Sequence, residues 1–80
     1  PVDLPLTGLN FPHGVSVDLH GDVYITDLNN NRVLKLAVGS ATPVALPFID
    51  LDFPYGVAVD NRGNVYVADF HNRIVKLSTN

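Results

Sequence analysis

Residues 1–27 read PVDLPLTGLNFPHGVSVDLHGDVYITD, and residues 43–69 read PVALPFIDLDFPYGVAVDNRGNVYVAD. The two stretches are identical at 15 of 27 aligned positions, at an offset of 42 residues. The offset then falls to 41, so that NRVLKL at 31–36 aligns with NRIVKL at 72–77. The chain of 80 residues therefore contains two copies of one structural unit, 1–42 and 43–80, and a repeat of this length is typical of a repeat architecture.

Each unit predicts short β-strands and no helix. In the first unit, Gly14–Asp18 alternates in polarity, and Val23–Thr26 is rich in β-branched and aromatic residues. The turn His20–Asp22 separates them, and its glycine accepts a positive φ. A third strand, Arg32–Leu36, follows the Asn-rich turn Asn29–Asn31. The corresponding strands of the second unit are expected at 56–60, 65–68 and 73–77.

A fourth strand is expected at the start of each unit, at Val2–Leu4 and Val44–Leu46. The prolines that follow, Pro5 and Pro47, suit the edge of a sheet. Four short strands in about 40 residues are typical of a propeller blade. Each outer strand in this order completes the blade formed by the strands before it in the chain. The last blade therefore has no outer strand after it, and residues 1–5 have no strands before them to complete. We therefore expect two four-stranded blades per chain, with residues 1–5 completing a blade of a neighbouring chain.

Composition points to the same kind of partner, a second copy of the chain. Five Lys and Arg face eight Asp and Glu, a net charge of −3, which argues against a nucleic-acid partner. No apolar run approaches the roughly 18 residues of a membrane span. The chain has no Cys, so no disulfide stabilises its small core. Two blades cannot close a propeller alone, so we expect the chain to oligomerise until the propeller closes.

The motifs Gly-Val-x-Val-Asp, x-x-Gly-x-Val-Tyr-[Val/Ile]-x-Asp and Asn-Arg-[Val/Ile]-x-Lys-Leu resemble the NHL repeat in both units. Together with the Leu-Pro-[Leu/Phe] segments, they resemble the extracellular six-bladed sensor domains of bacterial receptor serine/threonine kinases and the designed propellers derived from such repeats. The resemblance implies an all-β propeller that acts as a binding platform, and an extracellular location if the chain derives from such a sensor. Related two-blade designs are trimers, which implies a homotrimer of six blades here.

His13 and Tyr55 occupy the same place in the two units, in Phe-Pro-His-Gly and Phe-Pro-Tyr-Gly. This place precedes the innermost strand of a blade, so both side chains are expected to line the central channel near one mouth. Three copies of His13 around a trimer axis would match three-His zinc geometry, and imidazole also binds copper. The alternative is a channel residue that packs against Phe11 and Pro12. Nothing in the sequence requires a cofactor.

The paired acidic residues are interpreted as structural. Asp27 and Asp69 end the second strand of each unit, where they can pair with Arg32 and Arg73. A catalytic site is needed once, whereas these residues occur in both units. The repetition therefore predicts structural salt bridges.

The remaining titratable turn residues are interpreted in the same way. Asp18 and Asp60 lie at a turn, where an aspartate accepts hydrogen bonds from turn amides. His20 and His71 are expected to be solvated, because neither has a second ligand at a helpful spacing. No cysteine nucleophile exists and no Ser–His–Asp arrangement follows from the spacing, so we do not expect an enzyme.

Three functions remain open at this point. The first, which we prefer, is a self-assembling propeller scaffold, natural or engineered, without catalytic activity. The second is a binding module that holds a protein or a small ligand at the channel mouth. The third is a symmetric metal-binding assembly that uses His13 from three chains.

We also expect the inner-strand and second-strand valines and isoleucine to be buried between blades. The side chains in this set are Val15, Val17, Val23, Ile25, Val57, Val59, Val65 and Val67.

Overall fold

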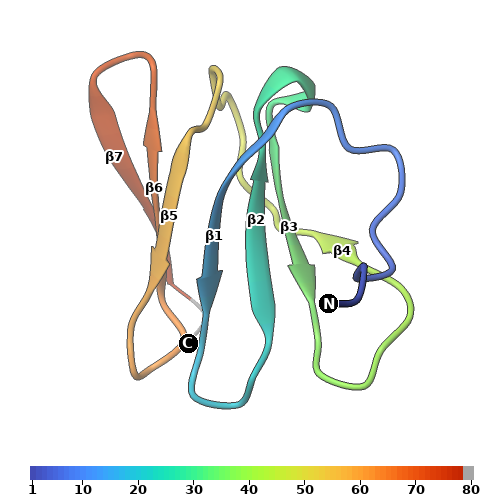
Figure 1. Ribbon diagram of the computed structural model, residues 1–80. Helices are drawn as coiled ribbons and strands as arrows, with labels where there is room; N and C mark the ends of the chain where they lie inside the picture. The colour runs from blue at the N-terminus through green and yellow to red at the C-terminus, as the bar shows by residue number, and fades with distance from the viewer. Residues whose placement is uncertain (79–80) are drawn as a thin grey trace.

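The computed structural model describes residues 1–78 and consists of two antiparallel sheets that lie face to face (Figure 1). Blade 1 has the strand order β1-β2-β3-β4, with bounds β1 (Pro12–Val17), β2 (Val23–Asp27), β3 (Arg32–Leu36) and β4 (Val44–Ala45). Blade 2 has the order β5-β6-β7, with bounds β5 (Gly56–Val59), β6 (Val65–Asp69) and β7 (Arg73–Leu77). The prediction of an all-β chain built from propeller blades is confirmed.

The Asn-rich segment forms a single 3-10 turn, η1 (Leu28–Asn30), instead of a plain loop. It ends at Asn31, which has a left-handed backbone with φ of 52°. Asparagine tolerates this conformation better than most residues, which explains its place here. Among the described residues, no helix is long and apolar enough to cross a membrane.

The β1–β2 and β5–β6 hairpins close in the same way. Gly21 and Gly63 have φ of 90° and 83°, a conformation that a Cβ atom would strain. Each glycine amide donates to the carbonyl oxygen of an aspartate, Asp18 or Asp60, at 3.1 Å. The turn therefore depends on glycine for its backbone and on the aspartate for its amide partners.

Blade 1 obtains its outer strand from the second sequence unit. Leu34 pairs with Ala45 and Lys35 pairs with Val44. Blade 2 has three strands within residues 1–78, so the outer edge of β7 has no strand beside it in this part of the chain.

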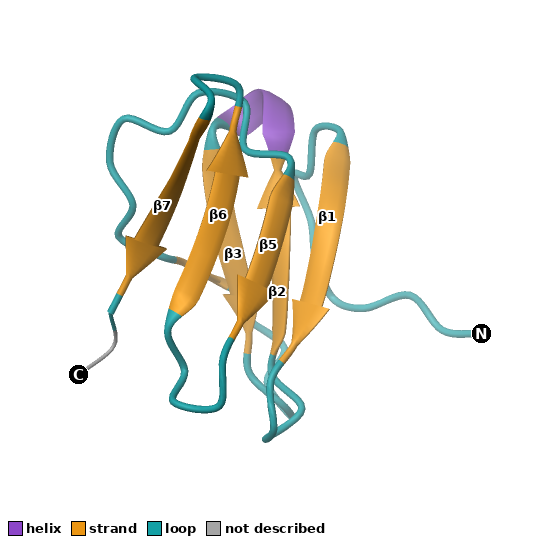
Figure 2. Cartoon of the chain, turned by 90° about the vertical axis from the view of Figure 1, so that its left-hand side faces the viewer, coloured by secondary structure: helices purple, strands orange, loops and turns teal. Residues whose placement is uncertain are grey.

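Residues 2–4 form no strand in the single chain, and the edge that we expect them to join, β7 of a neighbouring chain, lies outside it, so the strand at Val2–Leu4 stays a prediction. Residues 1–5 are exposed, and the N-terminal end of the chain projects from the body on the side opposite β7 (Figure 2). We call residues 1–5 the N-terminal arm.

The core lies in the contact between the two blades, which we call the inner seam. Tyr24 and Val33 of blade 1 are buried there against Val65 and Val67 of blade 2. Leu51, in the loop between β4 and β5, is also buried in this cluster. The partly buried side chains packed against the cluster are Leu46, Phe48, Val57, Val59, Val75 and Leu77.

Gly14 lies where the two inner strands approach each other closely. A Cβ atom at Gly14 would lie 2.9 Å from the Tyr55 carbonyl oxygen and 3.3 Å from the Gly56 Cα atom. Only glycine permits this distance, so Gly14 in β1 sets how tightly β1 packs on β5.

Val15 and Val17 are exposed in the single chain, and their burial between blades stays a prediction for the assembled propeller. Their exposed fractions are 67% and 58%, whereas the counterparts Val57 and Val59 pack on the core. Side chains alternate along a strand, and Gly14 faces blade 2, so Val15 and Val17 point away from it. The same repeat positions thus face the inner seam in blade 2 and the outer face of blade 1.

Candidate functional site

His13 and Tyr55, the two residues expected at the channel mouth, meet across the two blades. The His13 Nδ1 atom lies 2.8 Å from the Tyr55 carbonyl oxygen. Because a carbonyl oxygen only accepts, Nδ1 carries the proton in this contact, and Nε2 is the ring nitrogen left to bind another group. The imidazole also stacks on the Phe11 ring, with centroids 6.3 Å apart. His13 therefore joins the inner ends of the two blades and packs on Phe11.

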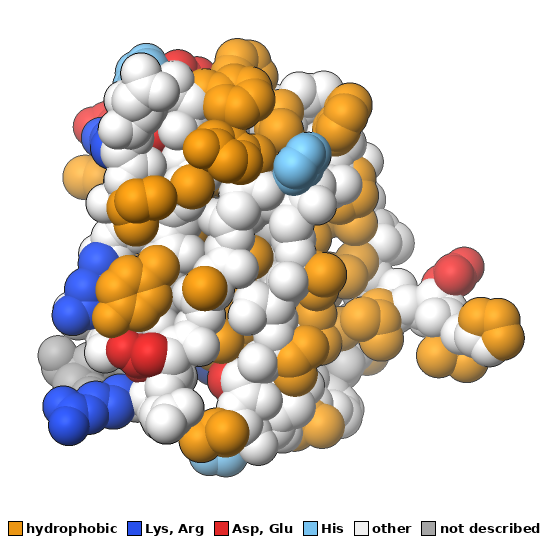
Figure 3. Space-filling model, turned by 60° about the vertical axis from the view of Figure 1, so that its left-hand side comes forward, with side chains coloured by type: hydrophobic (Ala, Val, Ile, Leu, Met, Phe, Trp, Pro, Cys, Tyr) orange, Lys and Arg blue, Asp and Glu red, His pale blue; other side chains and the backbone are white. Residues whose placement is uncertain are grey.

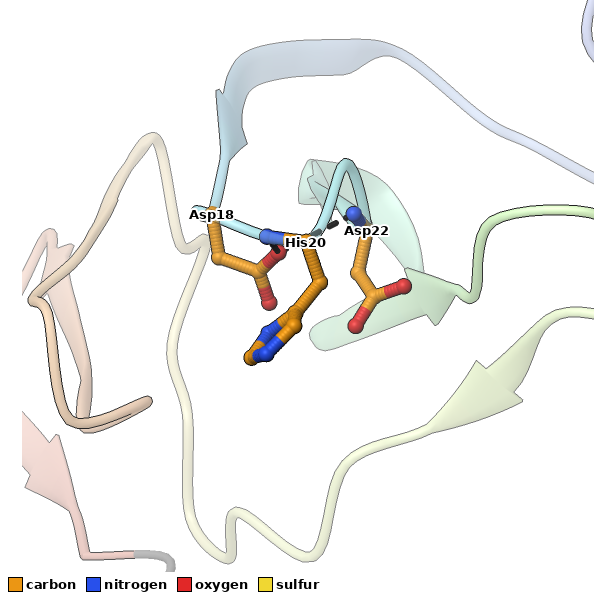
Figure 4. Close-up of side chains that lie close together, drawn as sticks. All are labelled: Asp18, His20 and Asp22. Atoms are coloured by element: carbon orange, nitrogen blue, oxygen red, sulfur yellow. Dashed lines mark hydrogen bonds between the residues drawn. The ribbon is translucent and has the colours of Figure 1, made fainter.

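Asp18, His20 and Asp22 lie together in the β1–β2 turn (Figure 4). Each offers a ligand atom within 4.8 Å of the others, a grouping that a metal ion could use. The spacing Asp-x-His-x-Asp is the signal in the sequence that would have predicted it. We expected His20 to be a solvated turn residue, and its side chain is exposed as expected.

The hydrogen bonds of the Asp18 carboxylate give this group a structural role. Asp18 Oδ1 accepts from the His20 and Asp22 amides at 2.9 and 3.0 Å, and Oδ2 accepts from the Tyr24 hydroxyl at 2.8 Å. Asp22 Oδ1 accepts from the Val38 amide at 2.8 Å. These carboxylates thus accept hydrogen bonds that hold the turn and the neighbouring loop in place.

Blade 2 has the same turn, but without the side chains that could bind a metal ion. Asp60 Oδ1 accepts from the Arg62 and Asn64 amides, each at 2.9 Å. Asp60 Oδ2 accepts from Asn64 Nδ2 and from the Tyr66 hydroxyl, each at 3.0 Å. Since Arg62 and Asn64 replace His20 and Asp22, the turn forms equally well without a histidine or a second carboxylate.

These hydrogen bonds shift the acidity of the turn residues. The Asn64 side chain, followed by the Asn64 and Arg62 amides, lowers the pKa of Asp60 to about 2 against the opposing effect of desolvation. Burial of the Asp18 carboxyl disfavours its charge, but bonds from Tyr24, Asp22 and His20 outweigh it, and the pKa of Asp18 is lowered. Burial and the bond to Asp18 raise the pKa of Tyr24 to about 12.

We predict that folding stability falls as the pH falls from about 4 to about 2. An unfolded aspartate has a pKa of about 3.9, so a group with a lower pKa in the folded state binds fewer protons when folded. Its stabilising effect is complete above the unfolded pKa and is lost as the pH falls through the folded value of about 2 for Asp60. Urea unfolding at a series of pH values should show a shallower acid loss in Asp60→Asn. An unchanged slope in this variant would contradict the assignment.

Two buried carboxylates anchor the far ends of the second strands. Asp27 and Asp69 are 0% and 1% exposed. Arg32 Nε lies 2.8 Å from Asp27 Oδ2, and Arg73 Nε lies 2.9 Å from Asp69 Oδ2. These are the two pairs that the sequence predicts, and each sits between adjacent strands of one blade.

Asp27 also ties the segment before β1 to the blade. Its oxygens accept from the Asn10 amide at 2.7 Å and from Asn30 Nδ2 at 2.8 Å. These bonds and the Arg32 side chain outweigh the effect of burial and lower the pKa of Asp27. The charged carboxylate is therefore a node for three segments of blade 1.

His71 has a partner that the sequence did not reveal. Its Nε2 atom lies 2.7 Å from Asp52 Oδ2, although the His71 side chain is exposed. Asp52 precedes β5 and His71 lies in the β6–β7 turn, so only the folded blade brings them together. In blade 1 the corresponding contact joins Asn29 Nδ2 to Asn10 Oδ1 at 3.2 Å.

Comparisons with known proteins agree with this geometry. The family model of the NHL repeat matches residues 9–36 and 51–74. A solved structure described as a streptogramin B lyase, a β-propeller, aligns with a TM-score of 0.59 at 22% sequence identity. The alignment covers 100% of this chain and 30% of that one, so this chain spans less than a third of its length. No curated protein matches the chain. At this identity the likeness to the lyase concerns the fold.

Proposed function

This chain belongs to the NHL-repeat family, whose fold supports a binding or scaffold module, and from that premise we propose that it is a propeller scaffold assembled from copies of itself. Three chains of two blades would form one six-bladed propeller. We assign the scaffold no catalytic activity, because the carboxylates grouped among the described residues are engaged by amides and side chains of their own turns and strands.

The observation that carries the proposal is that the two exposed faces of the chain are formed by the same repeat positions as the two faces that meet in the inner seam. Ile74 of blade 2 is the repeat counterpart of Val33, yet Ile74 is 69% exposed and Val33 is fully buried. In the same way, the exposed Val15 and Val17 are counterparts of Val57 and Val59, which pack on the inner seam. Blade 1 of a second copy therefore presents to blade 2 the kind of surface that blade 2 presents to blade 1.

The outer face of blade 2 also has room for such a partner. A shallow, largely apolar recess of about 220 Å³ lies on this face. Its lining residues are Gly56, Val57, Ala58, Tyr66, Ala68 and Ile74. In the inner seam the counterparts Tyr24 and Val33 are covered by valines of the next blade, so we assign the recess to Val15 and Val17 of a second copy. This contact is heterologous, and such contacts form closed assemblies when the rotation between copies closes.

The N-terminal arm supplies the second element of the proposed contact. In blade 1 the pair Leu34–Ala45 joins β3 to β4, and the Leu46 amide donates to the Val33 carbonyl oxygen at 2.9 Å. If the same register holds between copies, the repeat offsets would put Asp3 of one chain opposite Val75 of the next. Pairing there would cover the open edge of β7, which is otherwise a site for uncontrolled strand addition.

A disulfide cross-link tests this register directly. Val33 and Leu46 share a hydrogen bond, so the adjacent Leu34–Ala45 pair is of the closely spaced, non-hydrogen-bonded kind. The same spacing at Asp3 and Val75 suits a disulfide. Oxidation of the variant carrying both Asp3→Cys and Val75→Cys should yield covalently linked chains on a non-reducing gel.

The matched control carries Asp3→Cys and Ile49→Cys. Ile49 is 80% exposed and lies in the loop between β4 and β5, outside the proposed contact. It should give little cross-linked product. Cross-linking equal to that of the test variant, or none in either, would contradict the proposed register.

A metal centre on the three-fold axis is a second candidate function, favoured by the contact of His13 with Tyr55. Histidines that bind a metal commonly donate their other ring nitrogen to a carbonyl oxygen, as His13 Nδ1 does here at 2.8 Å. We propose that three Nε2 atoms bind zinc or copper once three chains assemble.

Zinc titration tests the metal centre. Wild type should bind about one ion per three chains at neutral pH, and His13→Ala should bind none at that site. Ligation requires neutral imidazole, so binding should weaken on acidification. Equal zinc binding by both proteins would leave His13 as a packing residue between the blades.

A further inference from the structure

Gly56 is the first residue of β5, and within residues 1–78 no contact requires a glycine there. Its φ is not positive, so a larger residue could adopt this backbone conformation. A Cβ atom added at Gly56 would meet only the Ala68 Cβ atom, at 3.7 Å, which is an ordinary van der Waals contact. Glycine weakens a strand and commonly marks a place where another backbone approaches closely. Gly56 therefore points to a neighbour that the single chain does not contain.

The counterpart Gly14 shows what such a neighbour requires. A Cβ atom at Gly14 would lie 2.9 Å from the Tyr55 carbonyl oxygen and 3.3 Å from the Gly56 Cα atom, both in the adjacent blade. Its own blade adds Thr26 Oγ1 at 3.2 Å, where blade 2 has Ala68. Gly56 lines the recess on the outer face of blade 2. By repeat position, the strand that would fill the space beside Gly56 is β1 of a second copy.

A side-chain hydrogen bond also joins the two blades at the end where β5 begins. Asn31, which precedes β3, accepts through Oδ1 from the Phe53 amide at 2.9 Å. The two residues have left-handed backbones, with φ of 52° and 49°. A bulky residue such as Phe53 rarely adopts this conformation, and the bond from its amide helps to hold it there. Asn31 thus fastens blade 1 to blade 2.

The counterparts of this pair, Asn72 and Phe11, have the same backbone conformation, with φ of 59° and 61°. Within residues 1–78 the Asn72 side chain has no hydrogen-bond partner, and the Phe11 amide has no acceptor. Phe11 is 61% exposed, whereas Phe53 is 39% exposed. Blade 2 thus offers the acceptor of a second bond of this kind, and blade 1 offers the donor.

Exposed hydrophobic side chains near Asn72 indicate the same missing neighbour. Phe70 of blade 2 is 58% exposed, whereas its counterpart Leu28 in blade 1 is half-buried. Figure 3 shows hydrophobic side chains gathered on the outer side of blade 2, toward the end where β5 begins. A copy whose Phe11 amide binds Asn72 would bring the Phe11 ring to this same end of blade 2.

We propose that Gly56 and Asn72 fix the position of the second copy: Gly56 admits the start of its β1, and Asn72 Oδ1 accepts a hydrogen bond from its Phe11 amide. The role assigned to these two residues rests on the proposed assembly, and it specifies how the copies dock. A heterologous contact closes into a ring only at one rotation, so the seam between copies has to repeat the inner seam. A strand placed as β5 is beside Gly14, and an amide placed as Phe53 is beside Asn31, would reproduce that seam.

Gly56→Ala tests the close approach of the second copy. The added methyl group fits the single chain, so circular dichroism should show the wild-type strands, but the group would clash with the backbone of the next copy. At a concentration where light scattering shows the wild type as a trimer, this variant should be present as single chains. The matched control is Ala41→Val, which adds bulk to an exposed residue in the loop between β3 and β4 and should assemble like the wild type.

Asn72→Gly tests the hydrogen bond, because glycine accepts the positive φ and lacks the side-chain acceptor. Loss of one bond at each of three seams should raise the protein concentration needed for half assembly about tenfold. Asn72→Asp keeps an acceptor oxygen and also tolerates a positive φ, so this variant should assemble at a concentration close to that of the wild type.

The outcomes separate the docking residues from the assembly itself. A wild type that remains as single chains would overturn both the assembly and the role of these residues. A trimeric wild type with equal assembly of Gly56→Ala would leave the scaffold in place and overturn the role of Gly56. Loss of strands in Gly56→Ala would also overturn that role, because the single chain would then need the glycine itself. Equal losses in Asn72→Gly and Asn72→Asp, or no loss in either, would overturn the role of Asn72.

Discussion

Replacement of Ile74 by aspartate is expected to convert the proposed trimer into single chains of 8.7 kDa. Ile74 lies at the proposed contact between copies, where its counterpart Val33 is fully buried in the inner seam. A carboxylate placed there would be buried without a partner, which is strongly unfavourable. A six-bladed propeller of three chains contains this contact three times, so the effect is repeated at each seam. Light scattering coupled to size-exclusion chromatography measures the mass, and circular dichroism checks that the strands remain.

The control for this prediction is Val38→Asp. Val38 is 67% exposed, as Ile74 is at 69%, but it lies in the loop after β3 and not on the outer face of blade 2. The control should assemble normally. Assembly of Ile74→Asp, or dissociation of both variants, would mean that the face containing Ile74 is not the contact between copies.

Replacement of Asp27 by alanine is expected to destabilise the fold by about 2–3 kcal/mol or more. Hydrogen bonds to charged groups each contribute about 1.5–3 kcal/mol, and Asp27 accepts such bonds from Asn10, Asn30 and Arg32. Part of the loss is offset because the Arg32 side chain is 37% exposed and can be hydrated. Urea unfolding at neutral pH measures the change in the free energy of unfolding.

Two further variants decide whether the charge or the shape of Asp27 matters. Asp27→Asn keeps the shape but replaces one acceptor oxygen by an NH2 donor that faces other donors, so this variant should also be destabilised. Asp50→Asn changes an exposed carboxylate that forms no ion pair within residues 1–78 and should alter stability by less than about 0.5 kcal/mol. Comparable losses in Asp27→Asn and Asp50→Asn would contradict the anchoring role of Asp27.

Much of the fold could be predicted because its determinants are local. The strand positions follow from short alternating or β-branched runs, and the hairpins follow from Gly21 and Gly63. The pairs Asp27–Arg32 and Asp69–Arg73 span four or five residues across a single turn, so their spacing already indicates contact. The 42-residue offset then applies each of these features to the second unit.

The features that could not be predicted depend on whether a neighbouring blade covers a given face of the sheet. Val15 and Val57 are identical residues at one repeat position, yet one is exposed and the other packs on the core, because only blade 2 has a neighbour on that side. No local pattern distinguishes them. The strand at Val2–Leu4 stays a prediction for a related reason, since the edge that it is expected to join belongs to a neighbouring chain.

The candidate site was predicted only in part. His13 and Tyr55 were placed together by the repeat, but the bond from His13 Nδ1 to the Tyr55 carbonyl oxygen depends on the packing of β1 on β5. The contact of His71 with Asp52 joins two segments separated by a hairpin, and neither residue matches its counterpart in blade 1. Contacts of this type require the tertiary arrangement and cannot be derived from spacing.

The mass of the unmodified protein in solution tests the central claim most directly. Light scattering at neutral pH should give three times the chain mass of 8.7 kDa in a single species, because three chains supply the six blades of a closed propeller. A single species of 8.7 kDa at the same concentration would contradict the account, since the outer faces that contain Val15 and Ile74 would then remain uncovered.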